Sequence, residues 1–87
     1  MTAAAGDDGP YLRTVGLRVR LLRVGRGLSQ EELGAVSGVS RVTVGSIERG
    51  DHPASVLAYR KLAKAFEIGL DELLDERDPR SGGVRPG

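Results

Sequence analysis

The sequence predicts a single small all-α domain. Three observations favour this fold class: apolar residues recur at helical spacing, capping residues stand at the boundaries of these segments, and no alternating strand pattern competes with them. The 87 residues are 39% hydrophobic but only 3% aromatic, so one aliphatic core is expected. We place the folded domain at residues 11–76, between a flexible N-terminal arm (1–10) and a flexible C-terminal tail (77–87).

The first helix is predicted over residues 12–24. Val15, Val19 and Leu22 fall on one face at helical spacing, so this face is expected to contact the core. The Gly25-Arg26-Gly27 segment then interrupts the helix.

Two short helices, predicted over residues 30–37 and 41–48, are joined by a tight turn. Each begins after a hydroxyl N-cap, and each ends at a glycine that can adopt the left-handed conformation. This layout over residues 29–50 is that of a helix-turn-helix. The residues that define it are Ser29 and Glu32 (a capping box), Gly38 (the first stop), Val39 (a buried turn residue), Ser40 (the second N-cap) and Gly50 (the second stop).

The last two helices are predicted over residues 56–66 and 70–75. Ser55 is a suitable N-cap for the first, and Gly69 is a tolerated cap for the second. The residues expected to face the core are Val56, Tyr59, Leu62, Ala63, Phe66, Leu70, Leu73 and Leu74.

Basic and acidic residues are segregated along the chain, although the formal net charge is only +1. Residues 12–28 contain five arginines and no acid, whereas residues 65–78 contain six carboxylates and one arginine. Such a dipolar layout can attract a polyanion to one side of the domain. The alternative is an ordinarily solvated surface of mixed charge.

The chain contains no cysteine and one histidine, His52, so neither a disulfide framework, a metal site nor a cofactor is expected. It also lacks a glycine motif that could cradle phosphates, which argues against an enzyme. No apolar run approaches the roughly 20 residues that cross a bilayer, and the first ten residues do not form a signal peptide. We therefore expect a cytoplasmic protein without a membrane partner.

Several segments occur in an order and at a spacing typical of one known family. They are VGLRVRLLR (15–23), GLSQEEL (27–33), GVSR (38–41) with IERG (47–50), and KLAKAF (61–66) with LDELL (70–74). Through them the chain resembles the lambda-repressor-like, Cro/Xre-type helix-turn-helix DNA-binding proteins over residues 15–74. The resemblance implies a five-helix domain that binds a pseudo-palindromic double-stranded DNA operator as a homodimer.

In this family the helix matching residues 41–48 is the recognition helix, and the resemblance implies that Arg41, Val42, Gly45 and Ser46 face the base edges. An arginine can donate two hydrogen bonds to guanine, and a valine can contact a thymine methyl. The alternatives are phosphate contact by Arg41 and a merely exposed Val42. The predicted phosphate contacts are Gln30, which the resemblance and its place at a helix start both indicate, with Ser40, Thr43, Arg49, Arg18, Arg20 and Lys61.

The resemblance also implies a partly buried structural ion pair between Arg23 and Glu48, with independent solvated charges as the alternative. Three residues depart from the family pattern: Gly34 replaces alanine, Ser37 replaces an apolar residue, and Gly45 lies inside the recognition helix. A glycine within a helix costs roughly 1 kcal/mol relative to alanine, which suggests a modestly stable domain.

Leu17, Leu21 and Val24 form a second apolar stripe on the first helix, rotated away from the core face. We predict a dimer or partner contact at this stripe. The alternative is that Tyr11, Leu12 or the C-terminal tail folds over it.

These observations predict a sequence-specific double-stranded DNA-binding transcriptional regulator. We expect a repressor that inserts helix 41–48 into the major groove as a homodimer. The alternative is a protein-interaction module, antitoxin-like or a co-regulator, with weak or no DNA binding. The apolar stripe and acidic residues 71–78 would support that alternative and a protein partner.

Overall fold

Five α-helices and a short 3-10 turn make up the described part of the chain, residues 7–81 of a computed structural model. This architecture confirms the predicted all-α class. The flexibility predicted for residues 1–6 and 82–87 concerns residues outside the described part. The elements are α1 (Gly9–Gly25), α2 (Gln30–Ser37), α3 (Arg41–Arg49), α4 (Val56–Phe66), α5 (Leu70–Leu73) and the 3-10 turn η2 (Pro79–Ser81).

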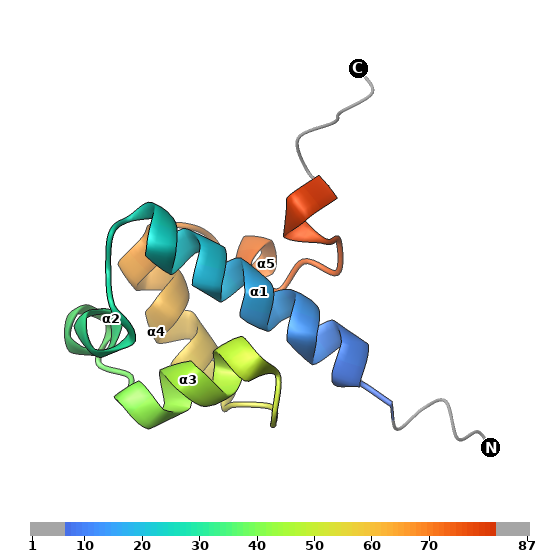
Figure 1. The fold of residues 1–87 in the computed structure, drawn as a ribbon, viewed down its shortest axis with the longest axis horizontal. Coiled ribbons are helices and arrows are strands. Elements are labelled where there is room, and N and C mark those ends of the chain that lie inside the picture. The colour runs from blue at the N-terminus through green and yellow to red at the C-terminus, as the bar shows by residue number, and fades with distance from the viewer. Residues whose placement is uncertain (1–6, 82–87) are drawn as a thin grey trace.

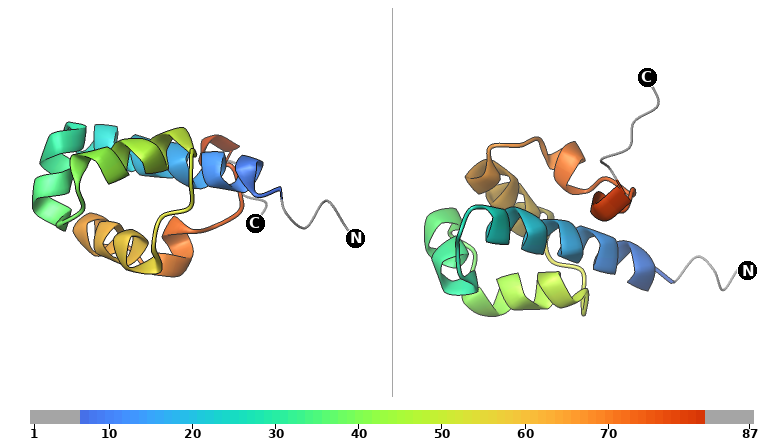
Figure 2. Two further views of the ribbon diagram at one scale, coloured as in Figure 1. Left: turned by 90° about the horizontal axis from the view of Figure 1, so that it is seen from below. Right: turned by 45° about the horizontal axis from the view of Figure 1, so that its top comes forward.

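The helices form two layers with the core between them. Helices α1 and α3 pack against each other in one layer, α4 and α5 form the other, and α2 lies at one end (Figure 1; Figure 2, left). Helix α3 and η2 lie on opposite sides of α1 (Figure 1; Figure 2, right). Within residues 7–81, no helix has both the length and the apolar character needed to span a membrane.

The core is aliphatic apart from Phe66 and Tyr59, as the composition predicts. Val56 was expected to face this core but is exposed, because it is the first residue of α4 and lies beyond the contact with the other layer. The buried apolar residues are Val15, Val19, Leu33, Val39, Val44, Ile47, Tyr59, Leu62, Ala63, Phe66 and Leu73.

The boundaries of the helical elements at both ends of the domain differ from the predicted ones. Helix α1 begins at Gly9 and not at residue 12, because Pro10 is tolerated in the first turn, where its missing N–H costs nothing. Helix α5 ends at Leu73 and not at residue 75. A flexible tail was expected from residue 77, but Pro79–Ser81 form η2, which contacts α1.

The turn between α2 and α3 accounts for two of the departures from the family pattern. A Cβ atom at Gly34 would lie 2.7 Å from the Val39 carbonyl oxygen, so the close approach of the turn requires glycine there. Ser37 Oγ donates to the Gly34 carbonyl and accepts a hydrogen bond from the Val39 N–H at 3.2 Å. The hydroxyl thus satisfies backbone groups where an apolar side chain could not.

Candidate nucleic-acid interface

Helix α3 is fixed so that one face packs on the domain and the other faces solvent. Ser40 Oγ accepts a hydrogen bond from the Thr43 N–H at 3.1 Å and donates one to Thr43 Oγ1 at 2.9 Å, which anchors the start of the helix. Gly50, with φ of 70°, ends the helix in the left-handed conformation. Val44 and Ile47 are buried in the core, so the opposite face points outward.

The outward face of α3 presents Arg41 and Val42 to solvent. Val42 is 74% exposed, Arg41 is also exposed, and Ser46 is half-buried one turn later. Within residues 7–81, the ion pairs join other residues and none involves Arg41. The N–H groups of its guanidinium are therefore free to donate two hydrogen bonds to one ligand, such as a guanine base.

Gly45 is not exposed on this face, contrary to the prediction that it faces the bases. It is buried, and a Cβ atom built there would lie 3.2 Å from Arg49 Nη1 and 3.6 Å from Gln30 Oε1. The missing side chain leaves room for these two side chains to lie across the helix. Gln30 and Arg49, rather than the backbone of Gly45, present polar atoms at this turn of α3.

One flank of α3 gathers three of the predicted phosphate contacts from three different helices. Arg20 of α1, Gln30 of α2 and Arg49 of α3 line the same shallow hollow. Arg49 Nε donates to Asp51 Oδ2 at 2.6 Å, but the two side chains are 62% and 42% exposed, so this ion pair is weak and can be exchanged for a phosphate.

The floor of that hollow is the predicted ion pair, which is present. Arg23 Nε and Nη2 donate to the two carboxylate oxygens of Glu48 at 2.7 Å and 3.0 Å, and the side chains are only 13% and 5% exposed. Arg23 also donates to the Leu28 carbonyl at 2.7 Å, and Gln30 Nε2 donates to Glu48 Oε1 at 3.2 Å. The hydrogen bonds to Glu48 raise the pKa of Arg23. This network positions Gln30 beside α3.

The other flank brings together Ser40, Thr43 and Lys61. These residues line a second shallow hollow, between the start of α3 and helix α4. Lys61 is exposed there, so its ammonium group can reach an anion held at the N-terminus of α3.

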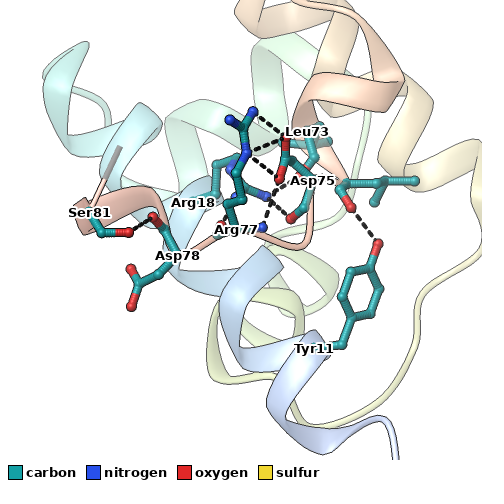
Figure 3. Close-up of polar contacts among 8 residues, drawn as sticks. Tyr11, Arg18, Leu73, Asp75, Arg77, Asp78 and Ser81 are labelled. Carbon is teal, nitrogen blue, oxygen red and sulfur yellow. Dashed lines mark hydrogen bonds and ion pairs between the residues drawn. The ribbon is translucent and has the colours of Figure 1, made fainter. Parts of the chain in front are cut away.

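Arg18 was predicted to contact phosphate, and the structure corrects this assignment. The residue is only 9% exposed and points away from α3, beneath the C-terminal segment (Figure 3). Arg18 Nη1 donates to the Leu73 and Asp75 carbonyls at 2.9 Å and 2.7 Å, and Nη2 donates to the Arg77 carbonyl. Because these partners lie 55 to 59 residues further along the chain, local sequence gives no signal for them.

His52 is a candidate that the sequence analysis did not assign to DNA. The residue is exposed and lines a hollow together with Val42, Thr43 and Ser46. Gly50 reverses the chain after α3, which returns His52 toward the outward face of the helix. In the sequence, the position of His52 two residues after Gly50 is the only local feature that indicates this placement.

The second apolar stripe of α1 faces away from both α3 and the core. Leu17 is half-buried, and Leu21 and Val24 are 44% and 57% exposed. Tyr11 does not cover the stripe, because its hydroxyl donates to the Leu74 carbonyl at 2.6 Å (Figure 3). The turn at Pro79 lies beside Leu21, so the C-terminal segment borders the stripe and leaves part of it open.

Comparison with known proteins matches the chain to one family and to several of its members. The model of the family HTH_3, described as helix-turn-helix, matches residues 19–73. The chain is 43% identical over 56 residues to the uncharacterized HTH-type transcriptional regulator YgzD of Bacillus subtilis, covering 64% of this chain and 85% of that protein. It is 38% identical over 56 residues to the control protein C.SmaI of Serratia marcescens, covering 64% and 67%.

A solved structure has a fold similar to that of this chain. The restriction-modification controller protein C.AhdI from Aeromonas hydrophila superposes with a TM-score of 0.71 at 43% sequence identity. The superposition covers 77% of this chain and 97% of that one.

Proposed function

The chain belongs to the helix-turn-helix family HTH_3, and we propose from this membership that it is a sequence-specific double-stranded DNA-binding transcriptional regulator. Helix α3 enters the major groove, and Arg41, Val42 and Ser46 meet the base edges. Gln30, Arg49 and Arg20 on one flank and Ser40, Thr43 and Lys61 on the other contact phosphates. The similarity to the transcriptional regulator YgzD, the control protein C.SmaI and the controller protein C.AhdI supports a regulatory role.

The observation that carries the proposal is the exposed start of α3 between two polar flanks. Arg41 is exposed on α3 and has no ion pair within residues 7–81. The polar side chains of the two flanks come from α1, α2 and α4 as well as from α3 itself. A helix in the major groove needs this arrangement, because base contacts give specificity and phosphate contacts fix its position.

The test combines selection of bound sites from random duplex DNA with the variant Arg41→Ala. The wild-type protein is expected to enrich one sequence, and Arg41→Ala to lose about 1–3 kcal/mol of preference at one base pair while still binding. Arg80→Ala is the matched control, because Arg80 lies in η2 on the opposite side of α1. Failure of the wild-type protein to enrich any site would contradict the proposal and favour the protein-interaction alternative.

The salt dependence of DNA affinity distinguishes residues that contact phosphates from residues that do not. Arg20→Ala and Lys61→Ala are each expected to reduce the slope of log affinity against log salt by about one per bound subunit, or about two for a homodimer. The matched control is Lys64→Ala, which removes an exposed charge one turn after Lys61. An unchanged slope in both test variants would remove these residues from the interface.

We further propose that the protein acts as a homodimeric repressor that covers its operator. Val56 and Leu57 are exposed apolar residues at the start of α4, and Val56 lines a hollow together with Asp7 and Asp8. Arg60 follows Val56 by one helical turn, so two copies related by a two-fold axis can pair opposite charges around this apolar surface.

Sedimentation velocity tests the dimer. Val56→Glu is expected to give a monomer that binds a half-site only, while Val36→Glu, which changes a similarly exposed valine on α2, keeps the dimer. A reporter gene with the selected site in its promoter tests repression, and increased expression would contradict the repressor role.

A further inference from the structure

Leu21 of the second apolar stripe of α1 lies together with several of the C-terminal acids in the folded chain, and the proposed DNA contacts use neither. Leu21 and Leu22 of α1 and Ile68 form the apolar lining of a groove. Its polar rim contains the acids Glu72, Asp75 and Asp78 and the bases Arg18 and Arg77. The groove has a volume of about 370 Å³. We call it the α1–η2 groove, because α1 and the segment leading into η2 are its two walls.

The rim of the groove carries three acids, Glu72, Asp75 and Asp78, and two bases, Arg18 and Arg77. The Arg77 guanidinium donates hydrogen bonds to Asp75 and holds the pKa of that carboxyl well below its usual range, and Arg80 lowers the pKa of Asp78 to about 2. Within residues 7–81, no ion pair involves Glu67, Asp71, Glu72 or Glu76. Asp75 and Asp78 remain ionised, but Arg77 and Arg80 balance their charges. The negative charge in excess at the rim is that of Glu72, and Asp71 and Glu76 add to it from the same acidic segment.

The groove and the candidate DNA interface lie on different sides of α1. Helix α3 packs on one side of α1, and the segment carrying η2 lies on the other (Figure 1; Figure 2, right). Arg18 fixes this segment against α1 through its three backbone carbonyls, so the wall is held in place (Figure 3). A ligand in the groove would therefore leave the outward face of α3 open to DNA.

A second copy of the chain is a poor occupant. A two-fold contact places the same patch of each copy against its equivalent, so the acidic rims would face each other. Like charges brought together across an interface disfavour association. The rim instead complements lysine and arginine side chains, and the apolar lining complements aliphatic side chains.

We propose that the α1–η2 groove binds a helix of another protein that carries an aliphatic stripe flanked by lysine or arginine residues. Aliphatic side chains enter between α1 and Ile68, next to Leu21 and Leu22. Basic side chains reach Glu72 and the neighbouring carboxylates, which fixes the orientation of the helix. The interaction does not depend on DNA, so a DNA-bound regulator can recruit or be held by such a partner.

The probe for the test is a synthetic helical peptide of leucine and lysine at heptad spacing, added to the isotope-labelled full chain. Methyl signals of Leu21, Leu22 and Ile68 are expected to shift on titration, and binding should weaken with salt. The matched peptide with glutamate in place of lysine should not bind. Shifts confined to other surfaces, or equal binding of the two peptides, would overturn the proposal.

Leu21→Ser and Glu72→Lys test the two parts of the site. Each is expected to weaken peptide binding about fivefold or more, while Val36→Ser and Glu31→Lys, exposed positions on α2, change it less than twofold. Equal losses in the α2 controls would indicate nonspecific adsorption and overturn the assignment.

Two further measurements distinguish the groove from the proposed DNA interface and from the proposed dimer surface. Operator affinity of Leu21→Ser and Glu72→Lys is expected to match that of the wild-type protein, so failure of DNA binding and failure of the groove give different results. Sedimentation velocity of Leu21→Ser should show an unchanged mass. A shift to monomer would mean that a second copy covers the groove and would refute the proposed partner.

Discussion

At the residue scale, Glu48 connects the stability of the domain to its candidate interface. Its carboxylate accepts two hydrogen bonds from Arg23 and one from Gln30, and it is almost completely buried. The carboxylate therefore neutralises a guanidinium that has little access to water. The same group holds Gln30 beside α3, so stability and phosphate contact share one side chain.

Glu48→Ala is expected to lower the free energy of unfolding by about 3–5 kcal/mol, because the Arg23 charge stays buried without its partner. Urea unfolding followed by circular dichroism measures this change. Asp51→Ala is the control, since it breaks the exposed ion pair with Arg49 and should cost no more than about 1 kcal/mol. Similar small losses in both variants would show that the Arg23–Glu48 pair is not desolvated in solution.

At the element scale, the packing of α1 on α3 depends on Gly16. A Cβ atom there would lie 2.2 Å from the Ile47 carbonyl oxygen and 2.8 Å from that of Glu48. These are backbone atoms, so a larger residue cannot be accommodated by turning a side chain. The glycine therefore sets how closely α3 approaches α1.

Gly16→Ala is expected to destabilise the fold by about 1–3 kcal/mol or more, because the two helices must separate. Gly25→Ala, at the end of the same helix, has no atom within 4 Å of the added Cβ and should be neutral or stabilising by up to about 1 kcal/mol. Thermal unfolding of the two variants gives the comparison. Equal changes in the stability of the two variants would mean that helix propensity, and not the close approach of α1 and α3, determines the effect of Gly16→Ala.

The sequence predicted the elements best where their signals are local. The capping box of Ser29 and Glu32 is present, and Gly38 ends α2 with φ of 82°, because these signals act within a few residues. The roles of Gly16 and Arg18 were not predictable from local pattern. Their partners lie in other helices, and only the folded chain brings them together.

At the scale of the whole molecule, Arg18 joins the C-terminal segment to the core. Arg18→Met keeps the apolar part of the side chain but removes the donors to three carbonyls, at a cost of roughly 1–3 kcal/mol for each carbonyl that stays buried. Hydrogen exchange is expected to accelerate for the amides of residues 75–81. Arg20→Met, at an exposed position on the same helix, should leave both measurements unchanged, and an equal effect there would contradict the role of Arg18.

Tyr11 joins the two ends of the domain in a second way, which depends on pH. Burial, with smaller contributions from Tyr59 and nearby carboxylates, raises the pKa of Tyr11 above its ordinary value of 10.0. The folded state therefore holds the phenolic proton more tightly than the unfolded state. Its contribution to stability is complete below pH 10.0 and is lost as the pH rises through the folded-state pKa.

Tyr11→Phe is expected to lower the free energy of unfolding by about 1 kcal/mol at neutral pH, because the hydrogen bond to the Leu74 carbonyl is lost. Above pH 10.0 the wild-type protein should lose stability more steeply than the variant, so that the difference between them narrows. Urea unfolding between pH 7 and pH 11 measures both curves. Parallel curves would show that the Tyr11 proton is not linked to folding, and that the two ends of the domain are joined by Arg18 and apolar packing alone.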